Sequence, residues 1–478
     1  MTVDVGVIGG GVSGLAAAYD LTRQGYRVVV LERQVRAGGN VVSERIGGFL
    51  MEHGPSSVNG ASAQAAALAR ALGLDGQRCE LGSGVRYRYL VGGGVLRRIA
   101  THRLGFLTAG YLSPGARLRL LAEALVPPKD CDDETVAGFC TRRFGAEFTN
   151  RVIDPLVGGL FAGTANTLSM TAVFPALAAM ERTHGSVVRA LYKRPRTGAD
   201  MPGRKLYSWR HGVASLPWAL AARLGPALKT GVAVRRIRPL RDGYRIEVGA
   251  HGAFDVRAVV VATQPHVAAA LLENVDQGGA DAAASFEAPP LAVVFLGYRR
   301  DRVDHPLDGL GYLSPRGEGR ALTGAQFCST MFSHRAPGDH VALAAYLGGA
   351  RAPDLARLPP TDLVALARSE FRDLLGARGE PAIARVRQWP RGLPQYVPGH
   401  RRRVAALRAV ERARPGLFLT GNYFTGPSIA ACLAEACSVA VRAAAFLHGS
   451  VQKLSPGARS ARLSAMAGSD PIGALNEG

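Results

Sequence analysis

Three glycines and one acidic residue near the start of the chain have the types and spacing of a dinucleotide-binding site. Gly9, Gly11 and Gly14 form a G-x-G-x-x-G motif, and Glu32 follows 18 residues after the last of them. In such a motif the first glycine permits a tight turn, the second lets the backbone approach a pyrophosphate, and the third lets helix and strand pack closely. An acidic residue at this distance accepts a hydrogen bond from a ribose hydroxyl. The spacing predicts a dinucleotide pocket; the alternative is a βαβ turn with only a structural role.

The residues around this motif are of the types that form a strand, a helix and a second strand. Residues 5–8 are a short β-rich run, residues 15–23 are rich in Ala and Leu, and residues 27–31 are apolar and β-branched. Val12 and Ser13 lie at the start of the expected helix, where free N–H groups and the helix dipole favour a bound phosphate. The sequence therefore places the pyrophosphate against the beginning of this helix.

The length and composition predict a large protein of two or three domains with a strongly basic surface. The chain has 478 residues and a net charge of +21. That charge fits an arginine-rich surface without a specific role, an anionic substrate or an anionic membrane surface. Nucleic acid is disfavoured, because the basic residues are scattered rather than gathered on one predicted helix with aromatic neighbours.

The cysteines and the N-terminus indicate a cytoplasmic protein. The six cysteines have neither C-x-x-C nor histidine-paired spacing, so we expect reduced thiols and no metal site. The chain starts directly with a predicted strand, and no signal peptide is expected. No apolar run is expected to be long enough to span a membrane, which leaves attachment to a membrane surface open.

A glycine doublet and three later segments resemble one group of flavoenzymes. Gly38-Gly39 follows the acidic residue and Arg33, and this string resembles the N-terminal signature of the FAD-dependent amine oxidase and protoporphyrinogen oxidase superfamily. A nicotinamide dehydrogenase would not need the doublet, which leaves room for an isoalloxazine ring. Within the superfamily, the chain resembles the protoporphyrinogen oxidases most closely. Three segments carry this resemblance: GLFAG followed by LS, FP, E and GS in 159–186, PQY followed by GH in 394–400, and GNYFTGPSI in 421–429.

The resemblance implies FAD as the cofactor, in a pocket closed from both ends of the chain. The C-terminal segment supplies a second helix start near the pyrimidine end of the flavin, where negative charge develops on reduction. Asn40 and Pro427 depart from the family pattern. The residues implied to contact FAD are Gly9, Gly11, Val12, Ser13, Gly14, Glu32, Arg33, Gly38, Gly39, Gly54, Pro55, Val234, Thr263, Trp389, Gly421, Asn422, Gly426, Ser428 and Ile429.

The resemblance also implies a porphyrinogen substrate, with protoporphyrinogen IX oxidised to protoporphyrin IX in three rounds, O2 as the acceptor and H2O2 as the product. No catalytic side chain is expected, because the cofactor accepts the hydride. Arg88 matches the family arginine that pairs with a propionate, and Gln326 stands where an aliphatic residue is expected. Thr164 and His211 are further departures. The implied substrate-binding residues are Arg88, Gly159, Phe161, Ala162, Leu313, Gln326 and Tyr346.

A mostly apolar stretch, residues 104–126, has the pattern of a basic amphipathic helix. Its apolar residues recur at helical spacing as Leu118, Leu121 and Leu125, beside two arginines. This pattern indicates peripheral attachment to the cytoplasmic membrane. The alternative is an ordinary helical insert that packs on the rest of the protein.

The expected fold class is α/β, with a discontinuous Rossmann-type FAD-binding domain, a mixed-sheet substrate domain and a helical membrane-associating insert. After the insert, strands are expected at 232–237, 244–248, 256–262, 291–298, 311–315, 327–332 and 341–347, and helices at 361–375 and 429–447. The predicted FAD-binding parts are 1–85, 205–275 and 399–449. The other predicted parts are substrate-domain strands at 86–103, the insert at 104–204, the substrate-binding domain at 276–398 and a disordered tail at 450–478.

Several alternatives to protoporphyrinogen oxidation stay open. Coproporphyrinogen III, with four carboxylates, would react in the same way and would suit the positive charge. Amine oxidases commonly use a lysine near the flavin, and no lysine occurs between Lys229 and Lys453, so that activity and carotenoid desaturation are minor alternatives. Because of the departures from the family pattern, a flavin-binding relative without catalytic activity is a further alternative. A homodimer is compatible with the sequence.

Overall fold

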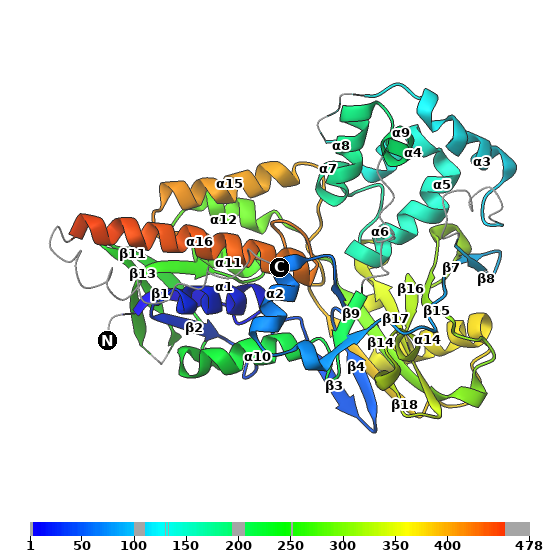
Figure 1. Cartoon of the computed structure of the whole chain (residues 1–478), viewed down its shortest axis with the longest axis horizontal. Helices are drawn as coiled ribbons and strands as arrows, with labels where there is room; N and C mark the ends of the chain where they lie inside the picture. Colours follow the sequence, from blue (N-terminus) through cyan, green and yellow to red (C-terminus); the bar gives the residue numbers. More distant parts are fainter. Residues whose placement is uncertain are drawn as a thin grey trace, which may run out of the picture.

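The computed structural model describes residues 3–99, 110–129, 131, 133–193, 206–249 and 252–454. The beginning of the predicted insert, 104–109, and the chain after residue 454 lie outside the described residues. Figure 1 shows one lobe in which long helices lie along a sheet, and a second lobe in which a cluster of short helices lies above another sheet.

The first sheet brings together strands from three separated parts of the chain. The parallel pairs are β10/β2, β2/β1, β1/β13 and β13/β19, and the antiparallel pairs are β12/β13 and β11/β12. In such sheets ligands bind beyond the carboxyl ends of the parallel strands. The strands, in spatial order, are β10 (Leu228–Thr230), β2 (Val28–Glu32), β1 (Val3–Ile8), β13 (Ala253–Val261), β12 (Gly243–Glu247) and β11 (Arg236–Leu240), and β19 (Leu417–Leu419) pairs with β13.

The strand predicted at 232–237 begins only at Arg236, so the predicted start of this strand was wrong by four residues. Val232 instead crosses the end of β2, where its N–H donates to the carbonyl oxygen of Glu32 at 2.8 Å. The competing contact with β2 takes these residues out of the ladder and places Val232 and Val234 in the wall of a cavity.

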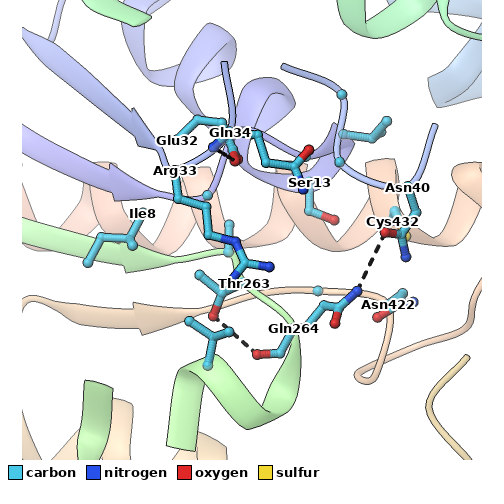
Figure 2. A pocket seen from close by; sticks show the side chains of 18 of the residues that line it. Ile8, Ser13, Glu32, Arg33, Gln34, Asn40, Thr263, Gln264, Asn422 and Cys432 are labelled. Atoms are coloured by element: carbon cyan, nitrogen blue, oxygen red, sulfur yellow. Dashed lines mark hydrogen bonds between the residues drawn. The ribbon is translucent and has the colours of Figure 1, made fainter. Parts of the chain in front are cut away.

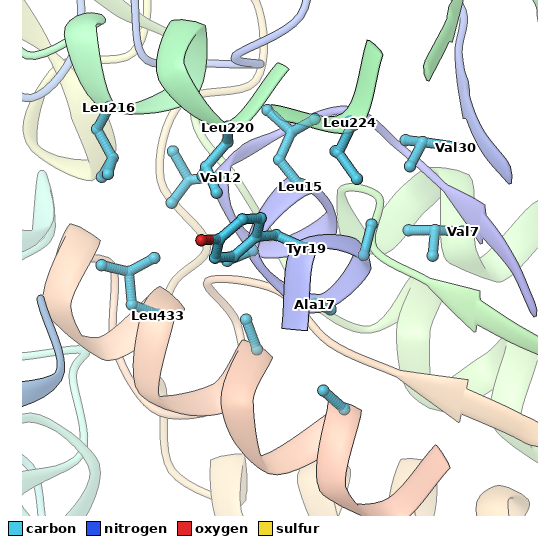
Figure 3. Close-up of a cluster of buried hydrophobic side chains, with 14 of the residues drawn as sticks. Val7, Val12, Leu15, Ala17, Tyr19, Val30, Leu216, Leu220, Leu224 and Leu433 are labelled. Atoms are coloured by element: carbon cyan, nitrogen blue, oxygen red, sulfur yellow. The ribbon is translucent and has the colours of Figure 1, made fainter. Parts of the chain in front are cut away.

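Helix α1 (Val12–Arg23) is the central helix of the first lobe, because aliphatic and small side chains cover most of its surface. Leu15, Ala17 and Leu21 are fully buried. They belong to a core cluster that also contains residues of α10 (Ser215–Leu224) and α16 (Ile429–Leu454), as Figure 3 shows. Full burial of one leucine contributes about 1.5–3 kcal/mol, so this cluster fixes the glycine turn that precedes α1. The other helices of this lobe are α2 (Ala63–Ala71), α11 (Pro265–Leu272), α12 (Gln277–Ala284) and α15 (His400–Ala413).

The second sheet has seven strands, and all its pairs are antiparallel except β15/β7. Its apolar face packs on α14 (Pro360–Leu375), which confirms the helix predicted at 361–375. The strands, in spatial order, are β18 (Ile383–Trp389), β14 (Leu291–Arg299), β17 (His340–Gly348), β16 (Gly324–Phe327), β15 (Gly309–Leu313), β7 (Tyr87–Gly92) and β8 (Val95–Arg98). Two smaller sheets join β3 (Ser43–Ile46) with β4 (Phe49–Glu52), and β5 (Val58–Asn59) with β9 (Leu206–Trp209) and β6 (Arg78–Glu80).

The strand predicted at 327–332 was wrong. β16 ends at Phe327, and Cys328–Met331 form one helical turn, α13. Ser329 Oγ accepts a hydrogen bond from the N–H of Ala342 on β17 at 3.1 Å. Short polar side chains that bond to nearby backbone in this way compete with a strand ladder, which explains the turn.

The insert is a cluster of short helices held by buried ion pairs. Glu123 and Arg143 are both fully buried and 2.8 Å apart, and Glu123 also accepts hydrogen bonds from Ser186 Oγ at 2.5 Å and from Val187 N–H at 3.1 Å. The helices are α3 (Pro114–Leu121), α4 (Val136–Phe144), α5 (Ala146–Phe148), α6 (Asp154–Phe161), α7 (Met170–Val173), α8 (Pro175–His184) and α9 (Val187–Lys193).

The predicted apolar stripe of the insert faces solvent. Leu118, Leu121 and Leu125 are 68, 54 and 82% exposed. Among the described residues, six of the eleven exposed large apolar side chains belong to the insert. The stripe is therefore available for contact with another surface.

Helix α16 corrects two expectations. It continues to Leu454, so the chain is still helical where a disordered tail was predicted to begin. Its segment Ile429–Gly449 is long and apolar enough to cross a membrane by length and composition, whereas no such run was expected. One face of this segment packs in the core with α1, through Ile429, Leu433, Ala436, Val439, Ala440, Ala443 and Leu447, while Val441 is exposed. The predicted fold class is confirmed, with a discontinuous α/β sheet, a second mixed sheet and a helical insert.

Candidate active site

A cavity of about 390 Å³ lies at the carboxyl ends of β1 and β2, where the glycine motif predicted a dinucleotide (Figure 2). Its walls also include Asn40, Gln264 and Cys432, which the sequence had not assigned to the cofactor. The predicted residues in its wall are Gly9, Gly11, Val12, Ser13, Glu32, Arg33, Gly38, Gly39, Pro55, Val234, Thr263, Gly421, Asn422 and Ile429.

The glycine turn has the shape that a pyrophosphate requires. Gly9 has φ +107°, and a Cβ atom on Gly14 would lie 2.0 Å from the Gly9 carbonyl oxygen, so neither position accepts a side chain. A Cβ on Gly11 would meet nothing within 4 Å, because this residue faces the cavity. No side chain caps the start of α1 and its first turn has no acid, which leaves its N–H groups for an anion. The residues of this turn therefore fit FAD. Gly14 itself allows the helix to pack closely on the strand.

Glu32 is held rigidly at the end of β2. Its two carboxylate oxygens accept hydrogen bonds from Gly10 N–H at 2.7 Å and from Gln34 N–H at 2.8 Å. Each oxygen keeps a further lone pair. The side chain is buried in the cavity wall, where it can accept from a ribose hydroxyl, as the sequence predicted.

The glycine doublet packs directly against the glycine turn. Gly38 N–H donates to the carbonyl oxygen of Gly10 at 2.8 Å, and a Cβ on Gly39 would lie 3.1 Å from Gly11 Cα. Arg36, which the sequence reasoning missed, donates from Nη2 to the Gly39 carbonyl oxygen at 3.0 Å. The doublet is thus required for close approach of two backbone segments. In the sequence, the position of Arg36 two residues before the doublet was the signal that could have identified it.

A second cavity of about 650 Å³ adjoins the first between the two lobes. Asn40, Pro55, Leu393 and Pro427 line both cavities. None of the described residues in the wall of the second cavity is Lys, Arg, Asp or Glu. The predicted residues in its wall are Gly159, Phe161, Ala162, Leu313, Gln326 and Tyr346, together with Gly54, Trp389, Gly426 and Ser428, which had been assigned to the cofactor.

Glycine and a strand leucine define one side of this cavity. A Cβ on Gly159 of α6 would lie 2.7 Å from Leu313 Cδ2, so the helix approaches β15 closely. Ala162 ends α6 in the left-handed conformation, with φ 51°, and its carbonyl oxygen lies beside Gly349. Together these residues bring the GLFAG segment onto the carboxyl ends of β15 and β17 in the second sheet.

Gln326 and Tyr346 form a hydrogen-bonded pair on adjacent strands. Tyr346 Oη donates to Gln326 Oε1 at 3.0 Å. Burial is the main reason that the pKa of Tyr346 lies far above its ordinary value, so the phenol stays protonated. Gln326, which stands where the family pattern has an aliphatic residue, therefore has Tyr346 as its hydrogen-bond partner in this chain.

Arg88 does not line either cavity. It shares a face of β7 with Leu90, whose strand partner is Leu313, so it lies on the cavity side of the sheet beyond the cavity wall. Burial lowers the pKa of Arg88 from its ordinary value. Its contact with a propionate stays a prediction.

The start of α16 lies between the two cavities. Pro427 and Ile429 line the first cavity, and Gly426 and Ser428 line the second. Ser428 Oγ accepts from Ala431 N–H at 3.1 Å and so caps the helix. The helix terminus therefore lies at the boundary of the two cavities, and its contact with the pyrimidine end of a flavin stays a prediction.

A buried ion pair between β4 and the residues that follow α13 was missed from the sequence. Arg335 contacts Glu52, and Glu52 accepts further hydrogen bonds from Ser43 Oγ at 2.5 Å and Val213 N–H at 2.8 Å. Burial raises the pKa of Glu52, and Arg335 opposes that shift. The two residues are 283 positions apart in the sequence, and no local pattern announces their contact.

Known proteins resemble this chain in sequence over most of its length. A family model described as flavin containing amine oxidoreductase matches residues 12–444. The chain is 29% identical over 473 residues to the chloroplastic protoporphyrinogen oxidase of Nicotiana tabacum, which covers 93% of this chain and 86% of the relative. It is 27% identical over 448 residues to the coproporphyrinogen III oxidase of Bacillus subtilis (strain 168), which covers 89% of this chain and 95% of the relative.

A solved structure agrees in fold. A provisionally named protoporphyrinogen oxidase from Exiguobacterium sp. 255-15 superposes with a TM-score of 0.81 at 23% identity and covers 94% of this chain and 99% of its own. The resemblance seen in the sequence is confirmed. The chain therefore belongs to the flavin-containing amine oxidoreductase family, as an oxidoreductase with FAD as its cofactor.

Proposed function

We propose that this protein oxidises a porphyrinogen to the porphyrin, with O2 as the acceptor and H2O2 as the product. The observation that carries the proposal is the large uncharged cavity that adjoins the cofactor cavity and shares four residues with it. A tetrapyrrole macrocycle is large and apolar at its centre, and such a slot suits it. Removal of six hydrogens in three rounds gives three H2O2 per porphyrin.

The side chains of this cavity position the substrate rather than react with it. When bound, FAD supplies the acceptor for a hydride from a substrate C–H, and O2 takes the electrons onward. Leu313, Tyr346 and Phe161 offer apolar and aromatic surface to a pyrrole ring, and Gly159 and Ala162 leave room for the macrocycle edge.

Two porphyrinogens fit this proposal. The sequence resemblance makes protoporphyrinogen IX the first candidate. Coproporphyrinogen III is the second candidate, because arginines line a cleft beside the uncharged cavity, where further carboxylates would lie. Arg88→Ala is expected to raise KM with FAD still bound, and an unchanged KM would remove Arg88 from the substrate site.

The exposed stripe Leu118, Leu121 and Leu125 supports a further part of the proposal, peripheral contact with the cytoplasmic membrane. An apolar porphyrinogen would partition to the same surface, so attachment there would bring enzyme and substrate together. The proposal includes no span of the membrane.

The reaction is tested with purified holoprotein and both porphyrinogens in air, followed by porphyrin fluorescence. We expect porphyrin to form far faster than in a control without protein. If FAD binds but neither substrate is oxidised faster than in that control, the chain is a flavin-binding relative without this activity.

A further inference from the structure

A third cavity, the α8/α15 cleft, lies beside the substrate cavity between the insert and the first lobe. Its volume is about 370 Å³. Ala172, Pro175 and Thr425 line both this cleft and the substrate cavity, so the two spaces adjoin. A group on the edge of a bound macrocycle can therefore extend into the cleft. Its wall consists of Thr171, Ala172, Pro175, Ala178, Arg182, Tyr396, His400, Arg401, Phe424 and Thr425.

Two exposed arginines give the cleft its charge. Arg182 follows Pro175 and Ala178 on one face of α8, and Arg401 lies in the first turn of α15. Within the described chain, neither guanidinium is ion-paired with a carboxylate, and the acid next to Arg182, Glu181, already pairs with Arg142. Both cations are available to a ligand.

The first turn of α15 also contains no acidic residue. It consists of His400, Arg401, Arg402 and Arg403, and no side chain caps the helix. Cations at the positive end of a helix dipole are unfavourable, and an anion bound there would offset both the dipole and the arginines. The nearby carboxylate of Asp133 is engaged by Ser169, Thr171 and the N–H of Gly399.

His400 supplies an independent sign of a ligand. The residue lines the cleft and is only 5% exposed, yet its ring Nδ1 has no hydrogen-bond partner within the described chain. Its ring lies against Tyr396, with centroids 4.5 Å apart. A buried polar atom without a partner is unfavourable by about 1–3 kcal/mol, so this wall of the cleft carries an unsatisfied polar group beside its two arginines.

We propose that the α8/α15 cleft binds carboxylate groups on the edge of the macrocycle held in the substrate cavity, through Arg182 and Arg401. This inference rests on the proposed function. The substrate cavity has no charged side chain in its described wall, so carboxylates must project beyond it. A guanidinium is suited to a carboxylate at such a site.

The position of the cleft favours a substrate with four carboxylates. Figure 1 places β7, which carries Arg88, on the far side of α6 from α7 and the start of α15. Coproporphyrinogen III has one carboxylate on each of its four rings, whereas protoporphyrinogen IX has two, on neighbouring rings. Arg88 lies on the strand next to Leu313 of the cavity wall, whereas the cleft adjoins Ala172, Pro175 and Thr425 of that wall. Cations beside two different parts of the cavity therefore match coproporphyrinogen III better, and it should have the lower KM.

The test compares the double variant Arg182→Gln/Arg401→Gln with Arg402→Gln, which lies in the same turn of α15 but outside the cleft. With holoenzyme and coproporphyrinogen III, we expect KM of the double variant to rise about tenfold or more, with kcat within about twofold. Protoporphyrinogen IX should be affected less, by under about threefold in KM. Arg402→Gln should behave as the unmodified protein. An unchanged KM for coproporphyrinogen III in the double variant, or an equal rise in Arg402→Gln, would overturn the inference.

A binding experiment separates this inference from the proposed function. Coproporphyrin III, the oxidised form, is titrated into holoprotein and its fluorescence is followed, which needs no turnover. Weaker binding by the double variant alone supports the cleft even if the unmodified protein oxidises neither porphyrinogen. Equal binding by all proteins overturns it, even if the unmodified protein is active.

Discussion

At the scale of single residues, the cofactor cavity depends on positions where no side chain is tolerated. Gly9, Gly14 and Gly39 are required by backbone contacts within the protein, whereas Gly11 is open on the cavity side. The sequence could predict all of these, because a motif of neighbouring residues determines the local backbone. It could not predict that Gln326 and Tyr346 bond to each other, because strand register decides that contact.

Gly11→Ala separates cofactor binding from folding. The backbone at Gly11 is extended, with φ −75°, and an added methyl meets no protein atom, so the stability of the apoprotein should change by less than about 0.5 kcal/mol. The methyl should prevent close approach of the pyrophosphate and weaken FAD binding by about tenfold or more. Flavin fluorescence on titration of apoprotein measures the affinity, with Gly76→Ala, another open glycine, as the control. Unchanged affinity for FAD would contradict the assignment.

Gln326→Leu restores the aliphatic residue that the family pattern expects and removes the partner of Tyr346. The partly buried phenol would then lose its hydrogen bond within the protein, at a cost of about 1 kcal/mol in the free energy of unfolding. Adding Tyr346→Phe should recover most of that loss. Urea unfolding of both single variants and the double variant gives the coupling. A double variant as unstable as Gln326→Leu would show that the pair is not the cause.

At the scale of elements, long-range ion pairs hold pieces that local pattern cannot join. The sequence predicted most strands of the second sheet and the helix α14, since their apolar periodicity is local. It missed α13, where Ser329 bonds to a neighbouring strand, and the pairing of Arg335 with Glu52. Such contacts join residues far apart in the chain, and only the folded structure brings them together.

The buried pair Glu123–Arg143 should be the main polar support of the insert. Glu123→Ala leaves Arg143 buried without its carboxylate and should destabilise the insert by about 3–5 kcal/mol. The matched control is Asp255→Ala, which breaks the exposed pair with Arg245 and should leave the free energy of unfolding nearly unchanged. Urea midpoints and limited proteolysis of the insert provide the readouts. Equal effects of the two substitutions would refute this role for the buried pair.

At the scale of the whole molecule, two adjoining cavities lie between lobes whose strands come from distant parts of the chain. The sequence predicted which segments return to the first sheet, because they resemble strands of a known family. It did not predict the α8/α15 cleft, whose walls come from the insert, α15 and the segment before α16. Cavities between elements depend on how these elements pack, which residue patterns do not encode locally.

Membrane contact is tested on the intact protein with anionic vesicles at low salt. The unmodified protein should sediment with the vesicles, and the triple variant Leu118→Ser/Leu121→Ser/Leu125→Ser should remain in the supernatant, because each apolar contact contributes about 1.5–3 kcal/mol at most. Val35→Ser/Leu240→Ser/Val441→Ser, at exposed apolar positions outside the insert, is the control. An unmodified protein that stays fully in the supernatant would exclude the attachment.

The most direct test of the central claim is the ratio of H2O2 to porphyrin formed by the purified holoprotein in air. The structure offers an uncharged macrocycle-sized cavity beside the FAD site, so we predict porphyrin from protoporphyrinogen IX or coproporphyrinogen III with three H2O2 for each porphyrin. Absence of porphyrin formation above the protein-free rate with both substrates, while FAD stays bound, would contradict the account.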